Sequence, residues 1–237
     1  MSVPTSAGTT GTYTFSPSAA DIVQNAFRKI QIWGEDIHAP HLADATMESN
    51  LLAIDISNRN PNMWQRELVT QVLTASDCDY TLNARTVLIS TATLSTTDGS
   101  GTVTERILTP IAADAYASYP VKLTEGTPSS YWFSLANPPV IYLYPTPDDA
   151  DTYTLNMWTF RQSMDVDLAS GYSPDAPYRF LDAFATGLAA RLAQIYRPEQ
   201  ADKLEAQFEA RFKRAAAMDQ ESAALSISPG LTAYYRI

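Results

Sequence analysis

Few residues in this chain have the types and spacing that chemistry at a metal centre requires. His38 and His41 are three residues apart and could present two imidazoles together, but no second histidine or cysteine pair follows, and zinc requires three or four ligands. Asp148, Asp149 and Asp151 lack the glycine and glutamate that a calcium loop places at its sixth and twelfth positions. The sequence therefore predicts no metal and no cofactor. It places the histidines near a helix start and the aspartates in a solvated turn.

Candidate catalytic groups are equally sparse. Asp77 and Asp79 bracket Cys78, and a carboxylate pair could serve a glycosidase, but carboxylates this close in a loop usually cap turns. Cys78 has no neighbouring base that would activate its thiol. The chain also lacks a Gly-x-Ser-x-Gly motif and a glycine-rich phosphate loop. We therefore predict no catalytic residue and a protein that is not an enzyme.

Aromatic residues cluster in the middle of the chain, at Tyr131-Trp132-Phe133 and at Tyr142 and Tyr144. Such side chains could bind a sugar. In strands, however, aromatic residues more often belong to a core or to one face of a sheet. The sequence leaves both interpretations open and favours the second.

The overall composition excludes one class of partner. The 237 residues carry a formal net charge of −10, with a sequence pI of about 4.6. Binding to nucleic acid by phosphate neutralisation requires a Lys/Arg surface, so we expect no binding of that kind, although an acidic wall could still face DNA that must slide without sticking. A single cysteine excludes an intrachain disulfide and fits a reducing compartment. No apolar run has the length of a membrane span, and no signal peptide is recognisable; a soluble protein is expected.

The longest helical pattern lies between Tyr178 and Glu221. Apolar residues recur there in steps of three and four, which is typical of a helix with one buried face. Pro198 falls where the first turn of a second helix tolerates a residue without an N–H. Two helices in tandem, about 44 residues at 1.5 Å each, would extend about 60 Å. We therefore expect a strut that runs past the chain's own core.

A strut of that length would pack against neighbouring subunits. Gly187 lies inside it, where glycine costs about 1 kcal/mol relative to alanine, so it marks either a close helix crossing or a tolerated accident. The residues expected to make the subunit contact are Leu181, Phe184, Gly187, Leu188, Phe208 and Phe212.

Two further helices are expected near the N-terminus. Ser18 and Asp21 have the spacing of a capping pair, and Gly34 is placed to end the helix that follows. Its apolar stripe consists of Ile22, Val23, Ala26, Phe27 and Ile30. The second helix is expected from Pro40 to about Asn58. Its expected stripe along one side consists of Ala43, Met47, Leu51 and Ile54.

From Trp64 onward the apolar pattern alternates with the period of a β-strand. Proline-rich turns separate the runs, which reads as an antiparallel meander. The expected strands are 68–74, 80–82, 86–94, 103–108, 131–133, 140–144 and 153–160. The predicted fold class is therefore α+β, with a bundle of N-terminal and C-terminal helices and an inserted antiparallel β domain whose ends lie close together.

This organisation divides the chain into an extended arm (1–15), a helical core (16–63 and 174–221), an inserted β domain (64–173) and a tail (222–237). The tail is too short to form a core, yet it is apolar and aromatic. Such a segment docks on another surface, by adding a strand or by filling pockets. The residues expected to dock are Leu225, Ile227, Leu231, Tyr234, Tyr235, Arg236 and Ile237.

The order of these elements resembles a known family. A first helix with Ser-Ala-Ala-Asp-Ile-Val-Gln-Asn-Ala-Phe (18–27) is followed by a second that ends before Trp64. The inserted β domain carries Gly-x-Pro-x-x-Tyr-Trp (126–132) and Tyr-x-Tyr-Pro-x-Pro-Asp (142–148), and an Ala-rich helix and an apolar tail complete the chain. From about Ser16, the chain resembles the head-to-tail adaptor (connector) proteins of short-tailed bacteriophages.

The resemblance implies a virion protein, made in the host cytoplasm, that forms a ring of twelve copies beneath the portal. Its helices would surround a DNA channel through which the genome is ejected. Its C-terminal tail would reach the portal protein, and its β domain would face the tail nozzle or fibres. No sequence-specific DNA binding and no membrane association are implied.

Two alternatives belong to other classes. The chain could be another tail, baseplate or fibre-attachment protein, in which the region around Tyr131 and Trp132 would be exposed for binding. It could also be a cell-wall hydrolase that uses an aspartate or a glutamate, which we regard as the weaker interpretation because no catalytic constellation is recognisable.

Overall fold

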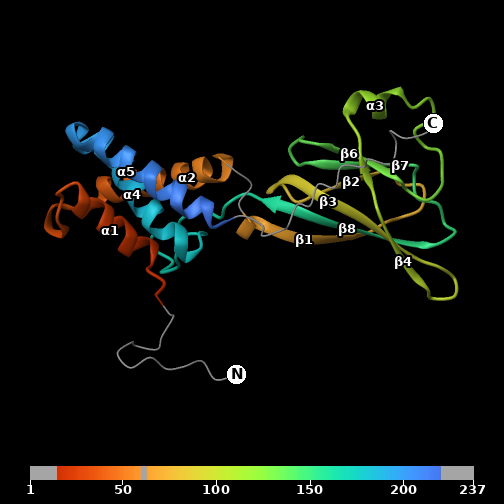
Figure 1. Cartoon of the computed structure of the whole chain (residues 1–237), viewed down its shortest axis with the longest axis horizontal. Helices are drawn as coiled ribbons and strands as arrows, with labels where there is room; N and C mark the ends of the chain where they lie inside the picture. The colour runs from red at the N-terminus through yellow and green to blue at the C-terminus, as the bar shows by residue number, and fades with distance from the viewer. Residues whose placement is uncertain (1–14, 60–62, 220–237) are drawn as a thin grey trace, which may run out of the picture.

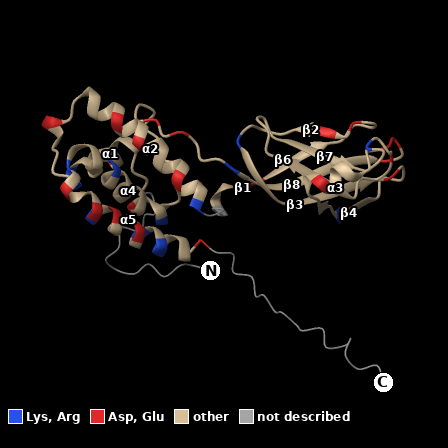
Figure 2. Cartoon of the chain, turned by 90° about the horizontal axis from the view of Figure 1, so that it is seen from above, with Lys and Arg blue, Asp and Glu red and all other residues tan. Residues whose placement is uncertain are grey.

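The computed structural model describes residues 15–59 and 63–219. They form an elongated molecule with helices at one end and strands at the other, seen in both Figure 1 and Figure 2. The predicted mixed α+β class is confirmed. The described helices are α1 (Ala19–Lys29), α2 (Ala39–Arg59), α3 (Ala113–Ser118), α4 (Tyr178–Tyr196) and α5 (Pro198–Ala217), with short 3₁₀ turns at Gly34–Asp36 and Met63–Gln65.

The strands form two sheets of four, with the orders β1-β8-β3-β4 and β2-β7-β6-β5. Their pairings are antiparallel apart from β5 with β6, which is parallel. The strands are β1 (Arg66–Val72), β2 (Asp79–Thr81), β3 (Thr86–Thr97), β4 (Val103–Ile107), β5 (Thr109–Pro110), β6 (Ser130–Ser134), β7 (Val140–Tyr144) and β8 (Thr152–Arg161).

Helix α1 begins as the sequence predicts. The Ser18 side chain accepts from the Asp21 N–H while the Asp21 carboxylate accepts from the Ser18 N–H, which completes a capping box. The predicted apolar stripe is buried. The helix ends at Lys29, however, and not at Gly34, because Gln31 adopts a positive φ of 62° and turns the chain.

Helices α4 and α5 correct the expected strut. They fold back on each other at Arg197, whose φ of −146° and ψ of 66° interrupt the helical path, and Pro198 opens α5 as predicted. One ion pair of 2.5 Å, between Asp182 near the start of α4 and Arg211 in the last third of α5, links the two helices. Each helix alone spans about 30 Å. Packing the two apolar stripes against each other buries both within one chain, which a continuous strut would leave exposed.

Gly187 lies where these helices cross. A Cβ atom at this position would lie 2.8 Å from Cδ2 of Phe208 and 3.0 Å from Cδ1 of Leu52. The absence of a side chain therefore lets α4 approach α5 and α2 closely. Of the two interpretations that the sequence leaves open, the close crossing is confirmed.

Helix α2 turns a different face to the core than the sequence predicts. Ala45, Leu52 and Ile56 are buried against α4, whereas Met47 and Ile54 of the predicted stripe are exposed. Apolar residues occupy two sides of this helix, so its sequence periodicity does not distinguish which side meets the core. The packing of α4 against the side with the smaller residues makes that choice.

The two sheets pack face to face around a core of their own, which also corrects the expected meander. Strand β1 pairs along its length with β8, the last strand, and Arg66 lies opposite Phe160. The predicted closeness of the two ends of the β region follows from this pairing. Sequence analysis missed β5 and α3, because a two-residue strand and a six-residue helix carry too little periodicity to be recognised.

An ion pair joins the sandwich to the helices. Arg161, at the end of β8, donates two hydrogen bonds of 2.5 and 3.0 Å to the carboxylate of Asp175, which precedes α4. The Trp64 indole donates to the backbone carbonyl of Asp175 at 3.2 Å and packs on Phe180 with ring centroids 4.6 Å apart. Burial opposes ionisation of Asp175, but the hydrogen bonds from Arg161 and the Met164 N–H outweigh it and lower its pKa.

Candidate functional site

The histidine pair occupies the predicted position at the start of α2. His41 Nδ1 accepts a hydrogen bond of 3.0 Å from the His38 N–H, and its ring packs edge-on against Phe27 and beside Tyr196. Both contacts give His41 a structural role. Across residues 15–59 and 63–219, no group of three or more His, Cys, Asp or Glu side chains could hold a metal ion.

The carboxylates near the strand ends also have structural partners. Asp148 accepts hydrogen bonds from the Tyr153 hydroxyl at 2.7 Å and from the Ala150 N–H at 3.2 Å, so it closes the turn before β8. Burial and the charge of Asp79 raise the pKa of Cys78. A raised pKa keeps the thiol protonated at neutral pH, which is the opposite of what a cysteine nucleophile requires.

The aromatic residues divide between the two faces of their sheet. Tyr131 is buried in the sandwich core, while Trp132 and Tyr142 stack on each other on the opposite face, with ring centroids 4.8 Å apart. Tyr116 of α3 covers that pair. The region that a fibre-attachment protein would expose is therefore packed against its own chain.

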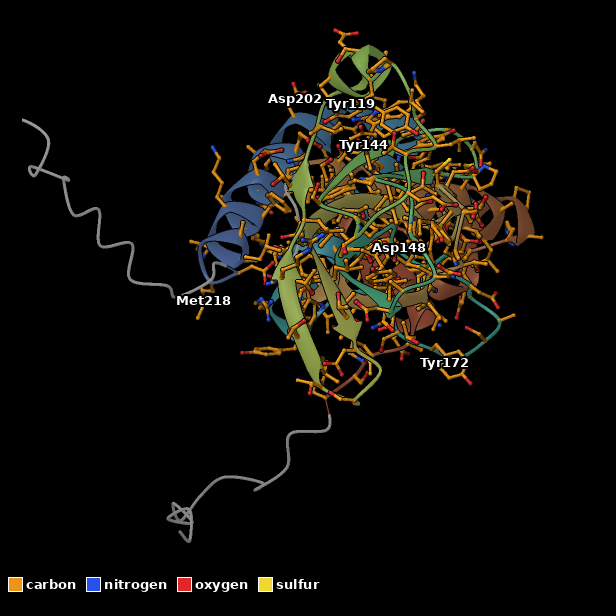
Figure 3. The ribbon with its side chains drawn as sticks, turned by 90° about the vertical axis from the view of Figure 1, so that its right-hand side faces the viewer. Tyr119, Tyr144, Asp148, Tyr172, Asp202 and Met218 are labelled. Atoms are coloured by element: carbon orange, nitrogen blue, oxygen red, sulfur yellow. The ribbon has the colours of Figure 1, made fainter. Side chains whose placement is uncertain are left out.

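The same aromatic cluster continues at its edge with Tyr119 and Tyr144, whose rings are stacked 3.8 Å apart at 8° (Figure 3). Burial, followed by the neighbouring Cys78, raises the pKa of Tyr116 to about 12. A phenol with that pKa stays protonated at neutral pH and does not act as a base. The cluster therefore positions α3 on the sheet, through ring faces that are already in contact with one another.

The residues predicted to pack between subunits lie in the chain's own helical core. Leu181, Phe184, Leu188, Phe208 and Phe212 are buried there, and Gly187 is at the helix crossing. Their contact with a neighbouring subunit stays a prediction. The residues predicted to dock the C-terminal tail, from Leu225 to Ile237, lie outside the described residues, as does the N-terminal arm apart from Phe15.

Several arginines of the helical region form ion pairs within the chain. Arg59 bridges Asp55 and Glu209, and Arg191 lies 3.4 Å from Glu48 and 3.5 Å from Asp55. Acidic and basic residues are interspersed along α5 (Figure 2). Arginines that neutralise neighbouring carboxylates do not form the single-sign surface that phosphate binding requires. Whether DNA passes this acidic chain without binding stays a prediction.

Large apolar side chains are exposed at several places on the surface, and two of them involve neighbouring residues of one element or sheet. One part is the outward side of α2, with Met47 and Leu51. The other is the outer face of the sheet β1-β8-β3-β4, where Leu68 lies opposite Trp158. Contiguous apolar surfaces are candidates for contact with another protein. Sequence analysis did not predict that the Met47 side of α2 faces outward, although the presence of apolar residues on both sides of that helix was a usable signal.

In the described part of the chain, His41, Asp148 and Asp175 have structural contacts, Arg59 and Arg191 lie in ion pairs, and large apolar side chains are exposed on α2. The chain belongs to the SU10 adaptor protein family, whose model matches residues 8–231. This is a phage head–tail adaptor family, so the chain is a structural adaptor protein of a phage virion, as the resemblance implied. No curated protein matches the chain. None of the helices in its described part has the length and apolar character needed to cross a bilayer.

Proposed function

We propose that this protein forms a ring between the portal and the tail of the virion, and that the ring continues the channel through which DNA leaves the capsid. The observation that carries the proposal is the family match over residues 8–231. The open apolar faces support self-assembly. The net charge of −10 and the paired arginines support a channel wall that DNA passes without binding.

The proposed partners are other copies of this chain, twelve in the complete ring, together with the portal protein above and a tail nozzle or fibre protein below. We assign portal docking to the tail of residues 222–237, because its apolar and aromatic side chains have too few neighbours in sequence to form a core. The chain is made in the host cytoplasm and acts in the neck of the virion during genome ejection.

Deleting residues 222–237 from the full chain tests the portal assignment. The truncated protein should keep its fold, since the tail follows the last described helix, and should lose binding to purified portal. Native mass measurement of the mixture counts the copies bound. Unchanged binding would contradict the assignment of the tail.

The position in the virion is tested separately. Electron microscopy of particles that carry a label on this chain should show a band at the neck of the vertex. A label at the distal end of the tail would support a baseplate or fibre-attachment protein and overturn the adaptor proposal.

A further inference from the structure

The outward side of α2 is apolar and carries no charge. Met47, Leu51 and Ile54 are 61%, 42% and 40% exposed, and Ala43 continues their line by one turn. They follow one another at spacings of three and four, so they form a ridge along one side of the helix. A helix of a soluble protein normally turns charged residues to water.

The charged residues of α2 lie elsewhere and have partners within the chain. Asp44 accepts from the Tyr196 hydroxyl, and Glu48 and Asp55 lie 3.4 and 3.5 Å from Arg191 of α4. These contacts anchor α2 to α4 and separate its charges from the ridge. The helix thus has one apolar side against its own core and a second apolar side that faces outward.

The ridge continues toward the sandwich. A groove at the C-terminal end of α2 is lined by Ile54, Val87, Leu88 and Phe160 together with polar and charged residues that include Arg59 and Arg161. The apolar side of α2 therefore ends at a mixed groove beside the sheet. We call Ala43, Met47, Leu51 and Ile54 the α2 ridge.

A second apolar surface of different shape lies on the other side of α1. There a hollow opens between α1 and the start of α4, lined among others by Phe15, Ile22, Tyr178 and Leu181. Phe15 is 82% exposed and Tyr178 is 77% exposed. Helix α1 separates this α1–α4 hollow from the ridge side, where its residues Ala20, Val23 and Gln24 line another groove with α2.

The hollow is lined by two carboxylates that have partners within the chain. Asp21 accepts hydrogen bonds from the Ser18 N–H and hydroxyl, and Asp182 is paired with Arg211. Two chains of net charge −10 repel each other, so copies associate most easily where like charges do not face each other. The α2 ridge brings no charge to such a contact and therefore sets no like charge opposite Asp21 or Asp182, and a convex ridge fits a concave hollow.

We propose that the α2 ridge of one copy packs into the α1–α4 hollow of the next copy. The inference rests on the proposed ring and names the surfaces that would build it. Because the two surfaces differ, the contact is heterologous, and a repeated heterologous contact forms a ring when its rotation closes and a helical filament when it does not. The occupant of the ridge is therefore a second copy of this chain.

The test uses two full-length variants. The ridge variant is Met47→Asp with Leu51→Asp, and the hollow variant is Phe15→Asp with Tyr178→Asp. All four side chains are exposed, and an aspartate at the first position of α4 suits the helix dipole, so both variants should fold with an unchanged Tm. The matched control is Leu123→Asp, an exposed apolar residue in the segment between α3 and β6.

Association is measured by sedimentation and native mass spectrometry wherever the wild-type chain assembles, alone or on purified portal. Each variant by itself should associate about 30-fold more weakly or worse, the effect of losing a central apolar contact. The control should assemble like the wild type. An equal mixture of the two variants, without portal, should form a complex of two copies that does not grow, because it retains one intact ridge and one intact hollow.

The outcomes separate the two proposals. If the wild type assembles and the ridge variant assembles equally well, the inference is overturned while the ring stands. If the mixture forms no pair although the wild type assembles without portal, the surfaces are not complementary and the inference is also overturned. If the wild type stays monomeric both alone and with the portal, the ring itself is contradicted.

Discussion

The sandwich and the helical core differ in how the chain closes them. The sandwich core is built from one continuous stretch between Leu73 and Met157, whereas the helical core combines residues from Ala19 to Ile56 with residues from Val166 to Ala215. The contacts of the helical core therefore join distant parts of the chain, as in the hydrogen bond of 2.8 Å from Lys29 Nζ to Thr186 Oγ1. Joining distant segments costs loop entropy that local contacts avoid.

The pairing of β1 with β8 reduces that cost. It brings Arg66 beside Phe160 and so returns the chain to the place where it left the first helices. We therefore expect the helical core to depend on a folded sandwich, which brings its two halves together. The sandwich should fold without the helical core. Substitutions in the two regions and at their junction test this expected dependence.

The largest effect is expected from Phe208→Ala in the helical core, with Met157→Ala in the sandwich as its counterpart. Both side chains are buried, and truncation should cost about 3–5 kcal/mol for phenylalanine and about 2–5 kcal/mol for methionine. Hydrogen exchange should show loosened helices and an intact sandwich for Phe208→Ala, but loosening of both regions for Met157→Ala. A sandwich that loosens equally in both variants would contradict the expected dependence.

A smaller effect is expected at the junction, from Arg161→Gln. It leaves the half-buried Asp175 without its bidentate partner, and an unsatisfied buried group costs about 1–3 kcal/mol. Denaturant unfolding of the full chain measures this loss. Arg85→Gln is the comparison: it removes an exposed pair with Glu67 and only a weaker charge interaction with Asp175, so it should cost less than about 1 kcal/mol. Equal losses of unfolding free energy would show that the Arg161–Asp175 pair stabilises the chain no more than an exposed ion pair does.

Gly187→Ala should be destabilising by about 1 kcal/mol, because overpacking against Phe208 exceeds the gain in helix propensity. Gly34→Ala is the matched control, since a Cβ there meets nothing within 4 Å, and its effect should stay within about 0.5 kcal/mol. Thermal unfolding checks both. A stabilised Gly187→Ala would mean that the helices separate easily at their crossing.

The smallest effect is a dependence of stability on pH. The folded-state pKa of Asp175 is lowered, so its contribution is complete above the unfolded value of about 3.9 and is lost as the pH falls through the folded value. The stability difference between wild type and Asp175→Asn should therefore be constant near neutral pH and shrink below about pH 4. A difference that persists unchanged in acid would assign the effect to packing instead of charge.

Much of the fold could be predicted because it depends on neighbours in sequence. The capping box of Ser18 and Asp21, the place of Pro198 at the start of α5, and most strands follow from local rules. The predicted structural roles of His41 and Asp148 likewise rested on what their nearest residues can provide. The family match then confirmed the resemblance that the order of these elements suggested.

The candidate surfaces could not be predicted in the same way. The stripe with Met47 and Leu51 has the spacing of a buried face, and only the position of α4 shows that it is turned outward. Phe15 and Tyr178 are separated by most of the chain, and they meet at the hollow because α1 packs on α4. Sequence spacing carries no information about such pairs.

The amino-acid sequence by itself determined where helices and strands form, and that the chain is acidic with few groups suited to catalysis. Periodicity, caps and charge are properties of residues and their neighbours. Only the packed molecule shows that α4 and α5 fold into a hairpin, that the strands divide into two sheets, and that α2 turns its second apolar side outward. Each of those choices compares the burial of competing faces across the whole molecule, which is a non-local quantity.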